Sequence, residues 1–189
     1  RPFALSVQLS RLAVSPKVCL DQLVRVTSDA TELLVQAKLT ADQGKPAGPW
    51  AGKLFGASFT LPAGYELLSV VGPAVEGFYE RSSDAARFLH VKFDRGQQET
   101  KIALVLVRKD VRLEAFDVPF VAYIDSGGSS SQAPAAAQQG RLAVQVAASL
   151  DAKTVDSKSL KPIVPATLKD WLDSNQINAV QFAYSYEQA

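Results

Sequence analysis

The sequence predicts an all-β fold, a two-sheet antiparallel β-sandwich with one short helix near the C-terminus. Apolar and polar residues alternate with a period of two in segment after segment, which is typical of strands with one buried face and one wet face. Clusters of proline and glycine separate these segments, as in FTLPAGYELLSVVGP at residues 59–73. The chain has 189 residues, and one domain takes roughly 100–200 residues. We therefore expect a single module over residues 1–189.

The first predicted strands lie at residues 3–9 (FALSVQL) and 31–39 (TELLVQAKL). The second should turn four side chains toward the core: Leu33, Val35, Ala37 and Leu39. Between these strands stands the only cysteine, Cys19, in an apolar stretch. A lone cysteine forms no internal disulfide, and we expect this one to be buried in the core.

Residues 59–73 predict a corner between strands. Pro62 and Gly64 break one strand, and Gly72 and Pro73 end the next. The intervening strand should present one face made of Tyr65, Leu67, Ser69 and Val71. The glycines do not follow the spacing of a phosphate-binding loop or a dinucleotide fingerprint, so the stretch predicts structure rather than a ligand loop.

Two further strands follow at residues 88–93 (FLHVKF) and 101–107 (KIALVLV). The second has no polar side, which predicts a central strand covered on both faces. The first carries the only histidine, His90, opposite the apolar face formed by Leu89, Val91 and Phe93. We expect His90 on the outer side of a sheet.

The C-terminal third predicts strands at residues 116–124, 140–150 and 179–187. Residues 126–139 are small and polar, which predicts a mobile loop. Residues 141–189 should then add strands and a short helix to the same module. The helix is expected within residues 165–176, where Leu168, Trp171 and Leu172 have helical spacing and Thr167 and Asp170 are spaced like a capping box.

Charge and hydropathy argue against two classes of partner. The net charge is +1, from 20 basic and 19 acidic residues, and the two signs are mixed, so nucleic-acid binding is disfavoured. Apolar runs are far shorter than the roughly 20 residues of a membrane helix, so we expect no membrane insertion of this segment. The chain starts at Arg1 and has no methionine, which we interpret as a piece of a longer protein.

The residues that could carry catalysis form no recognisable motif. His90 has no second histidine and no cysteine near it in the sequence, as the usual zinc sites require. Asp and Glu residues such as Glu76, Glu80, Asp94 and Asp117 are scattered over turns and polar faces. We therefore predict no catalytic residue, no metal site and no cofactor.

Aromatic residues offer the one candidate binding site. Modules that bind glycans stack sugar rings on exposed tryptophan or tyrosine, although packing is the commoner role of a large aromatic side chain. Trp50, beside a Pro-Gly stretch, and Tyr79, in EGFYERSSD, are the candidate ligand-binding residues. Tyr184 and Tyr186 are weaker ones.

One stretch also resembles a known kind of protein. It contains Leu61-Pro62-Ala63-Gly64, Val70-Val71-Gly72-Pro73-Ala74-Val75, Phe78 and Leu89-His90-Val91-Lys92-Phe93. This order is similar to β-sandwich segments of large secreted or envelope-anchored bacterial proteins whose function is unknown. The resemblance covers residues 52 to about 109. It implies an extracytoplasmic β-sandwich, secreted, periplasmic or associated with the cell envelope, and it implies no activity.

Three functions remain in order of preference. The first is a non-catalytic structural or interaction module of a larger extracytoplasmic protein. The second is a carbohydrate-binding module that uses Trp50 and Tyr79. The third is a glycoside-active enzyme with paired carboxylates. The expected partner is a protein or a polysaccharide, and the sequence leaves the oligomeric state open.

Overall fold

The computed structural model describes residues 16–41, 52–83, 86–109, 117–124, 138–154 and 156–188. Its strands are β1 (Pro16–Val26), β2 (Ala30–Ala41), β3 (Leu54–Leu61), β4 (Glu66–Val71), β5 (Val75–Ser82), β6 (Arg87–Gln97), β7 (Glu99–Lys109), β8 (Ala122–Ile124), β9 (Gln138–Val146), β10 (Lys161–Pro162) and β11 (Val180–Gln188). A 3-10 helix, η1 (Pro165–Leu168), and a helix, α1 (Ser174–Asn178), precede β11.

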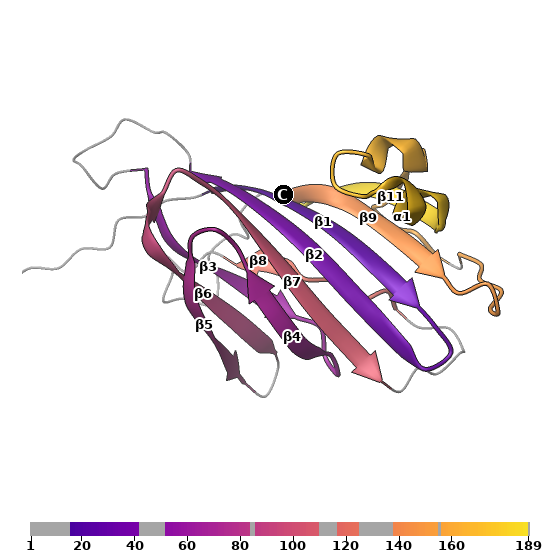
Figure 1. Ribbon diagram of the computed structural model, residues 1–189, viewed down its shortest axis with the longest axis horizontal. Helices are drawn as coiled ribbons and strands as arrows, with labels where there is room; N and C mark the ends of the chain where they lie inside the picture. The colour runs from indigo at the N-terminus through magenta and orange to yellow at the C-terminus, as the bar shows by residue number, and fades with distance from the viewer. Residues whose placement is uncertain are drawn as a thin grey trace, which may run out of the picture.

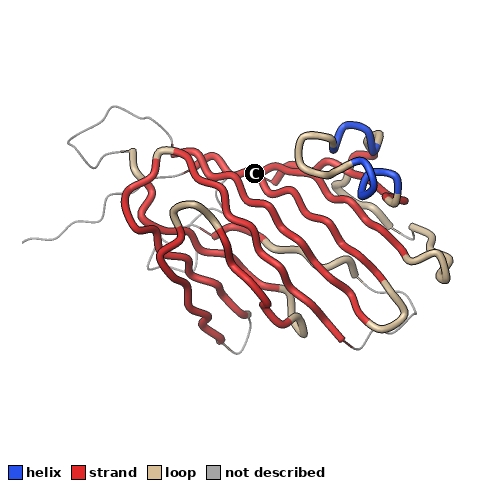
Figure 2. The backbone as a smooth tube through the Cα atoms, in the orientation of Figure 1, coloured by secondary structure: helices blue, strands red, loops and turns tan. Residues whose placement is uncertain are grey.

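These strands form two sheets (Figure 1). The seven-stranded sheet has the order β10-β11-β9-β1-β2-β7-β4, and the four-stranded sheet has the order β5-β6-β3-β8. Figure 2 shows how strands dominate the chain and how the helical turns gather at one end of the larger sheet. The predicted all-β sandwich with a short helix near the C-terminus is confirmed.

One pair of neighbours in the larger sheet is parallel. β1 pairs antiparallel with β2 but parallel with β9, and β11 then pairs antiparallel with β9. The last strands of the chain therefore lie beside its first described strand. Alternation along a strand reveals its buried face but not its neighbours, so the sequence did not predict the parallel pair.

The start of β9 corrects the predicted loop over 126–139. Gln138 and Gln139 are the first residues of β9, and Gln138 is buried. Its side-chain oxygen accepts a hydrogen bond of 3.0 Å from the backbone N–H of Tyr123. The polar composition of this stretch predicted a loop, but the polar side chain of Gln138 forms a hydrogen bond inside the fold. Residues 126–137 lie outside the described residues.

The main core lies between the two sheets. The predicted inner face of β2, from Leu33 to Leu39, is buried throughout. On the facing sheet, Phe59 is fully buried and meets the ring of Tyr123 edge-on, with centroids 6.0 Å apart. Gln22 is a buried polar residue in this core, and its amide both donates to and accepts from the backbone of Val121. These two hydrogen bonds hold the segment before β8 against β1.

The segment at 116–124 contributes less strand than expected. Within the described residues 117–124, only Ala122–Ile124 forms a strand, β8. Pro119 has no N–H to donate to a ladder, and the backbone of Val121 is satisfied by Gln22 instead. The strand predicted at residues 3–9 lies outside the described residues.

Residues 59–73 turn the chain from one sheet to the other and back. Gly64, with φ of 78°, lies in the corner between β3 of the smaller sheet and β4 of the larger one. The predicted inner face is confirmed at Tyr65 and Leu67, which pack in the main core. It is wrong after Leu67, because the register with β7 shifts between Leu67 and Ser69. After this bulge Val70 is buried and Val71 is exposed. A bulge exchanges the two faces of a strand, and period-two reasoning does not detect it.

Strand β7 is central, as predicted, because it lies between β2 and β4. Its inner residues Ile102, Leu104 and Leu106 are buried in the main core. On the outer face Val107 is buried, whereas Ala103 and Val105 are only half-buried. The expectation of full cover on both faces is therefore wrong at Ala103 and Val105.

The helical region differs in detail from the single predicted helix. Thr167 lies inside η1 and donates to the carbonyl of Val164, and the carboxylate of Asp170 accepts from Arg141. The capping box is formed instead by Asp173 and Gln176, at the start of α1. Leu168 and Leu172 are buried as expected, against Leu23, Ala143 and Ala183 on the outer face of the larger sheet.

Candidate functional site

Strand β5 ends the four-stranded sheet and, within the described part of the chain, pairs only with β6. It carries two exposed aromatic side chains, Phe78 (48% exposed) and Tyr79 (61% exposed). Strand β4, at the edge of the other sheet, exposes Leu68 and Val71. Four of the seven large hydrophobic side chains that the described residues expose therefore lie on two edge strands that follow one another in the sequence; the other three are Phe55, Val118 and Val164.

Among the described residues, the inner face of β5 packs against the main core at Val75 and is exposed from Phe78 onward. Phe78 stands opposite Val91, which is buried in the core, so Phe78 belongs to the inner face. Yet Glu80 and Ser82, further along the same face, are exposed. β5 thus extends past the larger sheet, at the end of the molecule away from the helical turns (Figure 1). In the described part of the chain, β5 is therefore exposed on both faces from Phe78 to Ser82, and no strand pairs with its second edge.

The acidic side chains of β5 are paired with bases of β6. Glu76 contacts Lys92 at 2.8 Å, and Glu80 contacts Arg87 at 2.5 Å. Arg87 also donates to the backbone carbonyl of Tyr65, which ties β6 to the corner before β4. Among the described residues Arg81 has no ion-pair partner. The charged side chain of β5 without an ion-pair partner among the described residues is therefore the positively charged Arg81.

The outer face of the same sheet carries a row formed by Tyr79, His90 and Ser58, which are register partners on β5, β6 and β3. The rings of Tyr79 and His90 are stacked, with centroids 4.8 Å apart and an angle of 23° between planes. Ser58 Oγ and His90 Nδ1 are 2.8 Å apart and share a hydrogen bond. Ser58 is buried, so its hydroxyl is out of reach of a substrate. The row holds the Tyr79 ring in place.

The other candidate residues are placed apart. Trp50 lies outside the described residues. Tyr186 is buried and Tyr184 half-buried. The carboxylates of Glu76 and Glu80 pair with bases, and Asp94 and Asp117 are exposed. In the described ranges no three His, Cys, Asp or Glu side chains gather in a group that could hold a metal ion.

An ion cluster on the outer face of the larger sheet was not predicted. The Arg141 guanidinium donates to Asp21 at 2.6 and 2.9 Å and to Asp170 at 2.6 and 2.9 Å. The hydrogen bond to Asp21 holds the pKa of Arg141 above its ordinary value, and the hydrogen bond from Arg141 lowers the pKa of Asp170. The three residues are far apart in the sequence, so no local signal marks them. The cluster joins η1 to β1 and β9.

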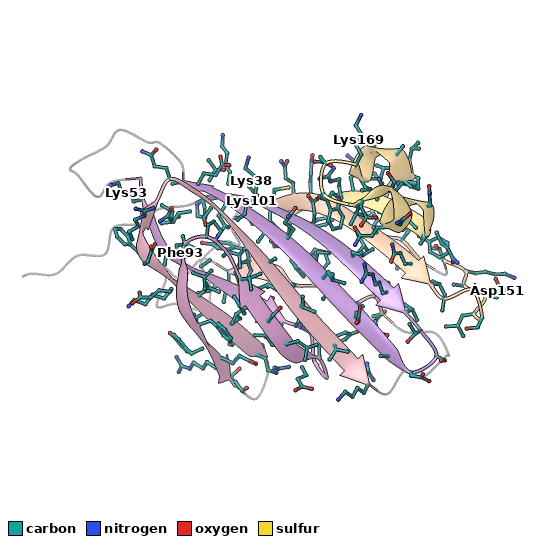
Figure 3. All side chains as sticks on the ribbon, in the orientation of Figure 1. Lys38, Lys53, Phe93, Lys101, Asp151 and Lys169 are labelled. Atoms are coloured by element: carbon teal, nitrogen blue, oxygen red, sulfur yellow. The ribbon has the colours of Figure 1, made fainter. Side chains whose placement is uncertain are left out.

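Cys19 lies beside this cluster and not in the main core, which corrects its predicted place. It is half-buried and precedes Asp21 by two positions, on the outer face of β1. Burial raises the pKa of its thiol, and the nearby carboxylate of Asp21 raises it further. Because burial and Asp21 raise the pKa of the thiol, Cys19 is protonated at neutral pH. Its register partner on β2 is Lys38, which in turn pairs with Lys101 on β7; both lysines are labelled in Figure 3.

An open groove of about 510 Å³ lies at the end of β1 and β9, beside the C-terminal end of α1. Its polar side chains are engaged with one another. Arg25 Nε donates to Gln145 Oε1 at 3.0 Å, and Gln145 Nε2 donates to the carbonyl of Gln176 at 2.6 Å. These contacts hold α1 against the sheet. Because the polar side chains of the groove already have partners, β5 is the better candidate for a binding surface.

No protein-family model matches the chain, and no curated protein matches its sequence. Among solved structures, it is similar to an M1 zinc metallopeptidase from Deinococcus radiodurans (10% identity, TM-score 0.46, 93% of this chain and 39% of that chain). It is also similar to native leukotriene A4 hydrolase from Saccharomyces cerevisiae (12% identity, TM-score 0.44, 92% of this chain and 27% of that chain). A third similar structure is a non-cellulosomal cohesin from Archaeoglobus fulgidus (10% identity, TM-score 0.37, 70% of this chain and 93% of that chain).

The chain therefore spans less than two fifths of the length of the two enzymes that it resembles. At these TM-scores the similarity supports no conclusion about this chain. No helix in the described ranges is long and apolar enough to cross a membrane.

Proposed function

We propose that this chain is a non-catalytic interaction module whose binding surface is the exposed strand β5. One observation carries the proposal: among the described residues β5 is exposed on both faces from Phe78 to Ser82 and has no strand along its second edge, yet it carries two aromatic side chains, Phe78 and Tyr79. Hydrophobic side chains that cluster on an open surface mark interaction sites more often than singly scattered ones do. An unpaired edge strand also invites association with another chain.

A matched pair of variants tests the surface. Phe78→Ser with Tyr79→Ser removes the aromatic side chains of β5, whereas Val164→Ser removes an equally exposed hydrophobic side chain before η1. Cross-linking in extracts of the source organism should give a specific adduct with wild type and with Val164→Ser, and not with the double variant. Equal adducts from all three proteins, each with an unchanged melting temperature, would refute the role of β5.

We also propose that the module works outside the cytoplasm, within a larger protein. The resemblance of residues 52 to about 109 to secreted and envelope-anchored proteins supports this placement. The intact mass of the native polypeptide, with mapping of both ends, tests whether the module is part of a larger protein. Fractionation of the source cells tests its location, and recovery of the protein in the cytoplasm alone would contradict a location outside it.

Tyr79 supports a second candidate, a carbohydrate-binding module. Its ring is exposed and is stacked on His90, and a fixed aromatic face suits the apolar face of a sugar ring. Tyr79→Ala should abolish retention on a polysaccharide gel, while Phe78→Ala, on the opposite face of β5, should leave it unchanged. Trp50→Ala tests the second residue of that hypothesis. Absence of binding across a broad glycan panel would exclude it.

The non-catalytic part of the proposal has its own test. Purified protein should hydrolyse model glycosides no faster than buffer does between pH 4 and pH 9. A rate that exceeds buffer and is lost on substitution of Glu76 or Glu80 would establish the enzyme alternative instead.

A further inference from the structure

We infer that β5 binds an extended strand of another protein, which adds to the edge of the four-stranded sheet and places a carboxylate opposite Arg81. This inference rests on the proposed function and names the class of partner for the same surface. The partner is defined by main chain in the extended conformation, by apolar side chains near the centre of the added strand, and by one acidic side chain.

The backbone of β5 specifies an extended partner. In an antiparallel pair, half of the N–H and C=O groups of a strand point to its neighbour and half point away. The neighbour of β5 is β6, and the described residues provide no strand on the other side. The groups that point away are spaced as another strand requires. Strand addition satisfies them, whereas a helix or a globular surface does not.

The side chains of β5 specify apolar residues in the added strand. Phe78 lies on the inner face and Tyr79 on the outer face, so an added strand would meet an aromatic side chain on each of its faces. Cross-strand pairs of aromatic residues with β-branched or aromatic residues stabilise a sheet. Alternate residues of the partner should therefore contact Phe78 and Tyr79 in turn.

The charges of β5 specify an acid. Glu76 and Glu80 are neutralised by Lys92 and Arg87 from the β6 side. Arg81 is exposed and has no ion pair among the described residues. A carboxylate placed opposite Arg81 would complete the charge pairing of the strand, and a lysine placed there would be repelled.

A second copy of the chain does not meet this requirement. A two-fold antiparallel pairing in one continuous sheet sets residues of the same face opposite one another. Glu80 lies on the face of Phe78 and Arg81 on the face of Tyr79, so Glu80 cannot face Arg81. Glu76, at the bulge of β5, already pairs with Lys92. A two-fold parallel pairing would set Arg81 beside its own copy. The charge pattern therefore favours a different chain.

Multivalent phage that display random ten-residue peptides provide the probe. Selection on the wild-type chain should enrich peptides with one acidic residue among β-branched or aromatic residues, and selection on Arg81→Glu should enrich basic ones. An enriched acidic peptide, made synthetically, should bind Arg81→Glu about three- to tenfold more weakly than wild type. Arg95→Glu, an exposed charge reversal on β6, is the matched control and should change its affinity by less than about twofold.

Hydrogen exchange then locates the peptide. Edge amides of β5 should exchange rapidly in the free chain and slowly with the peptide bound. The inference would be overturned if the selection enriched no peptides, or peptides without an acidic residue. It would also be overturned if the bound peptide protected the amides of another strand, or if the β5 amides were already protected in the dilute free chain. Protection that appears only as the free chain is concentrated would identify a second copy and would also overturn it.

The two proposals fail in different ways. If Phe78→Ser with Tyr79→Ser abolishes the native cross-link but no peptide protects β5, the surface stands and strand addition is wrong. If the double variant keeps the cross-link, the partner binds elsewhere and both proposals are wrong.

Discussion

The phenol hydroxyl of Tyr186 donates a hydrogen bond of 2.6 Å to the backbone carbonyl of Leu20. This contact joins β11 to β1 across the intervening strand β9. Gly140 is the register partner of both residues. A Cβ atom at position 140 would lie 1.8 Å from the Leu20 oxygen and 2.7 Å from the Tyr186 hydroxyl. The hydrogen bond therefore depends on the absence of a side chain in β9 at this point.

Gly140→Ala should destabilise the protein by about 3 kcal/mol or more, because the clash is with backbone, which moves less easily than a side chain. Urea-induced unfolding measures this change. Gly77→Ala is the control, since a Cβ there would meet nothing within 4 Å, and its free energy of unfolding should stay within about 0.5 kcal/mol of wild type. Equal stability of the two variants would show that β9 has room at Gly140.

Tyr186→Phe should lower the free energy of unfolding by about 1–2 kcal/mol. The Leu20 carbonyl loses its donor, and the Gln22 amide loses an acceptor at 3.2 Å, inside the core. Tyr184→Phe removes a hydroxyl whose contact with Thr154 is exposed, so its effect should be within about 0.5 kcal/mol. Thermal unfolding of both variants in parallel distinguishes the two roles, and a neutral Tyr186→Phe would contradict this one.

Asp170→Asn should destabilise the protein by about 1 kcal/mol or less, because the carboxylate is largely exposed. Arg141 lowers the pKa of Asp170 below its ordinary value of 3.8, so the folded state favours the ionised form. That contribution is present above pH 4 and disappears as the pH falls through the lowered pKa. Unfolding curves of both proteins between pH 7 and pH 2 should therefore converge at acid pH.

Asp151→Asn provides the control for this pH dependence, because it removes an exposed charge that has no ion-pair partner among the described residues. Its unfolding curve should follow that of wild type at every pH. A difference between wild type and Asp170→Asn that stays constant down to pH 2 would show that Arg141 does not act through the charge of Asp170.

Cys19 should react slowly with iodoacetamide at neutral pH. Burial and the Asp21 carboxylate raise the pKa of its thiol above the ordinary value of 9.0, and the thiolate is the reactive form. The alkylation rate at pH 8 should be at least about tenfold lower than in urea-unfolded chain, and it should rise with pH beyond 9. Mass spectrometry follows the reaction, and equal rates in the two states would mean that Cys19 is freely accessible.

Elastase should cut the native protein first within residues 126–137, which are rich in alanine, serine and glycine. Cleavage should stop before Gln138, because this residue is buried at the start of β9. Peptide mapping of early time points gives the positions. A first cut within β9 or β11 would contradict the prediction.

The inner faces of β2 and β6 could be read from the sequence because alternation is a property of neighbouring residues. Leu33 and Leu39 in β2, and Leu89 and Val91 in β6, are buried as the period of two predicts. The same reasoning failed at β4, where a bulge after Leu67 exchanges the faces. The prediction for Cys19 came from its apolar neighbours in the sequence, and it failed because the side of β1 that bears Cys19 is covered by polar groups and helical turns as well as by apolar ones.

The candidate site was only half predictable. Tyr79 was named from its surroundings in the sequence, and the structure places it on an open strand. Phe78, two ion pairs and the unpaired Arg81 were not foreseen as parts of one surface. Their relationship depends on β5 being an edge strand, which is a matter of sheet order.

Strand positions, apolar faces and the corner at Pro62 to Gly64 are local properties, and the order of amino acids was enough to predict most of them. Contacts between distant segments required the folded chain: Arg141 between Asp21 and Asp170, β9 beside β1, and β5 extending past the larger sheet. The reason is physical. Alternation follows from the geometry of a single strand, whereas strand order and exposed edges depend on which of many similar apolar faces pack together.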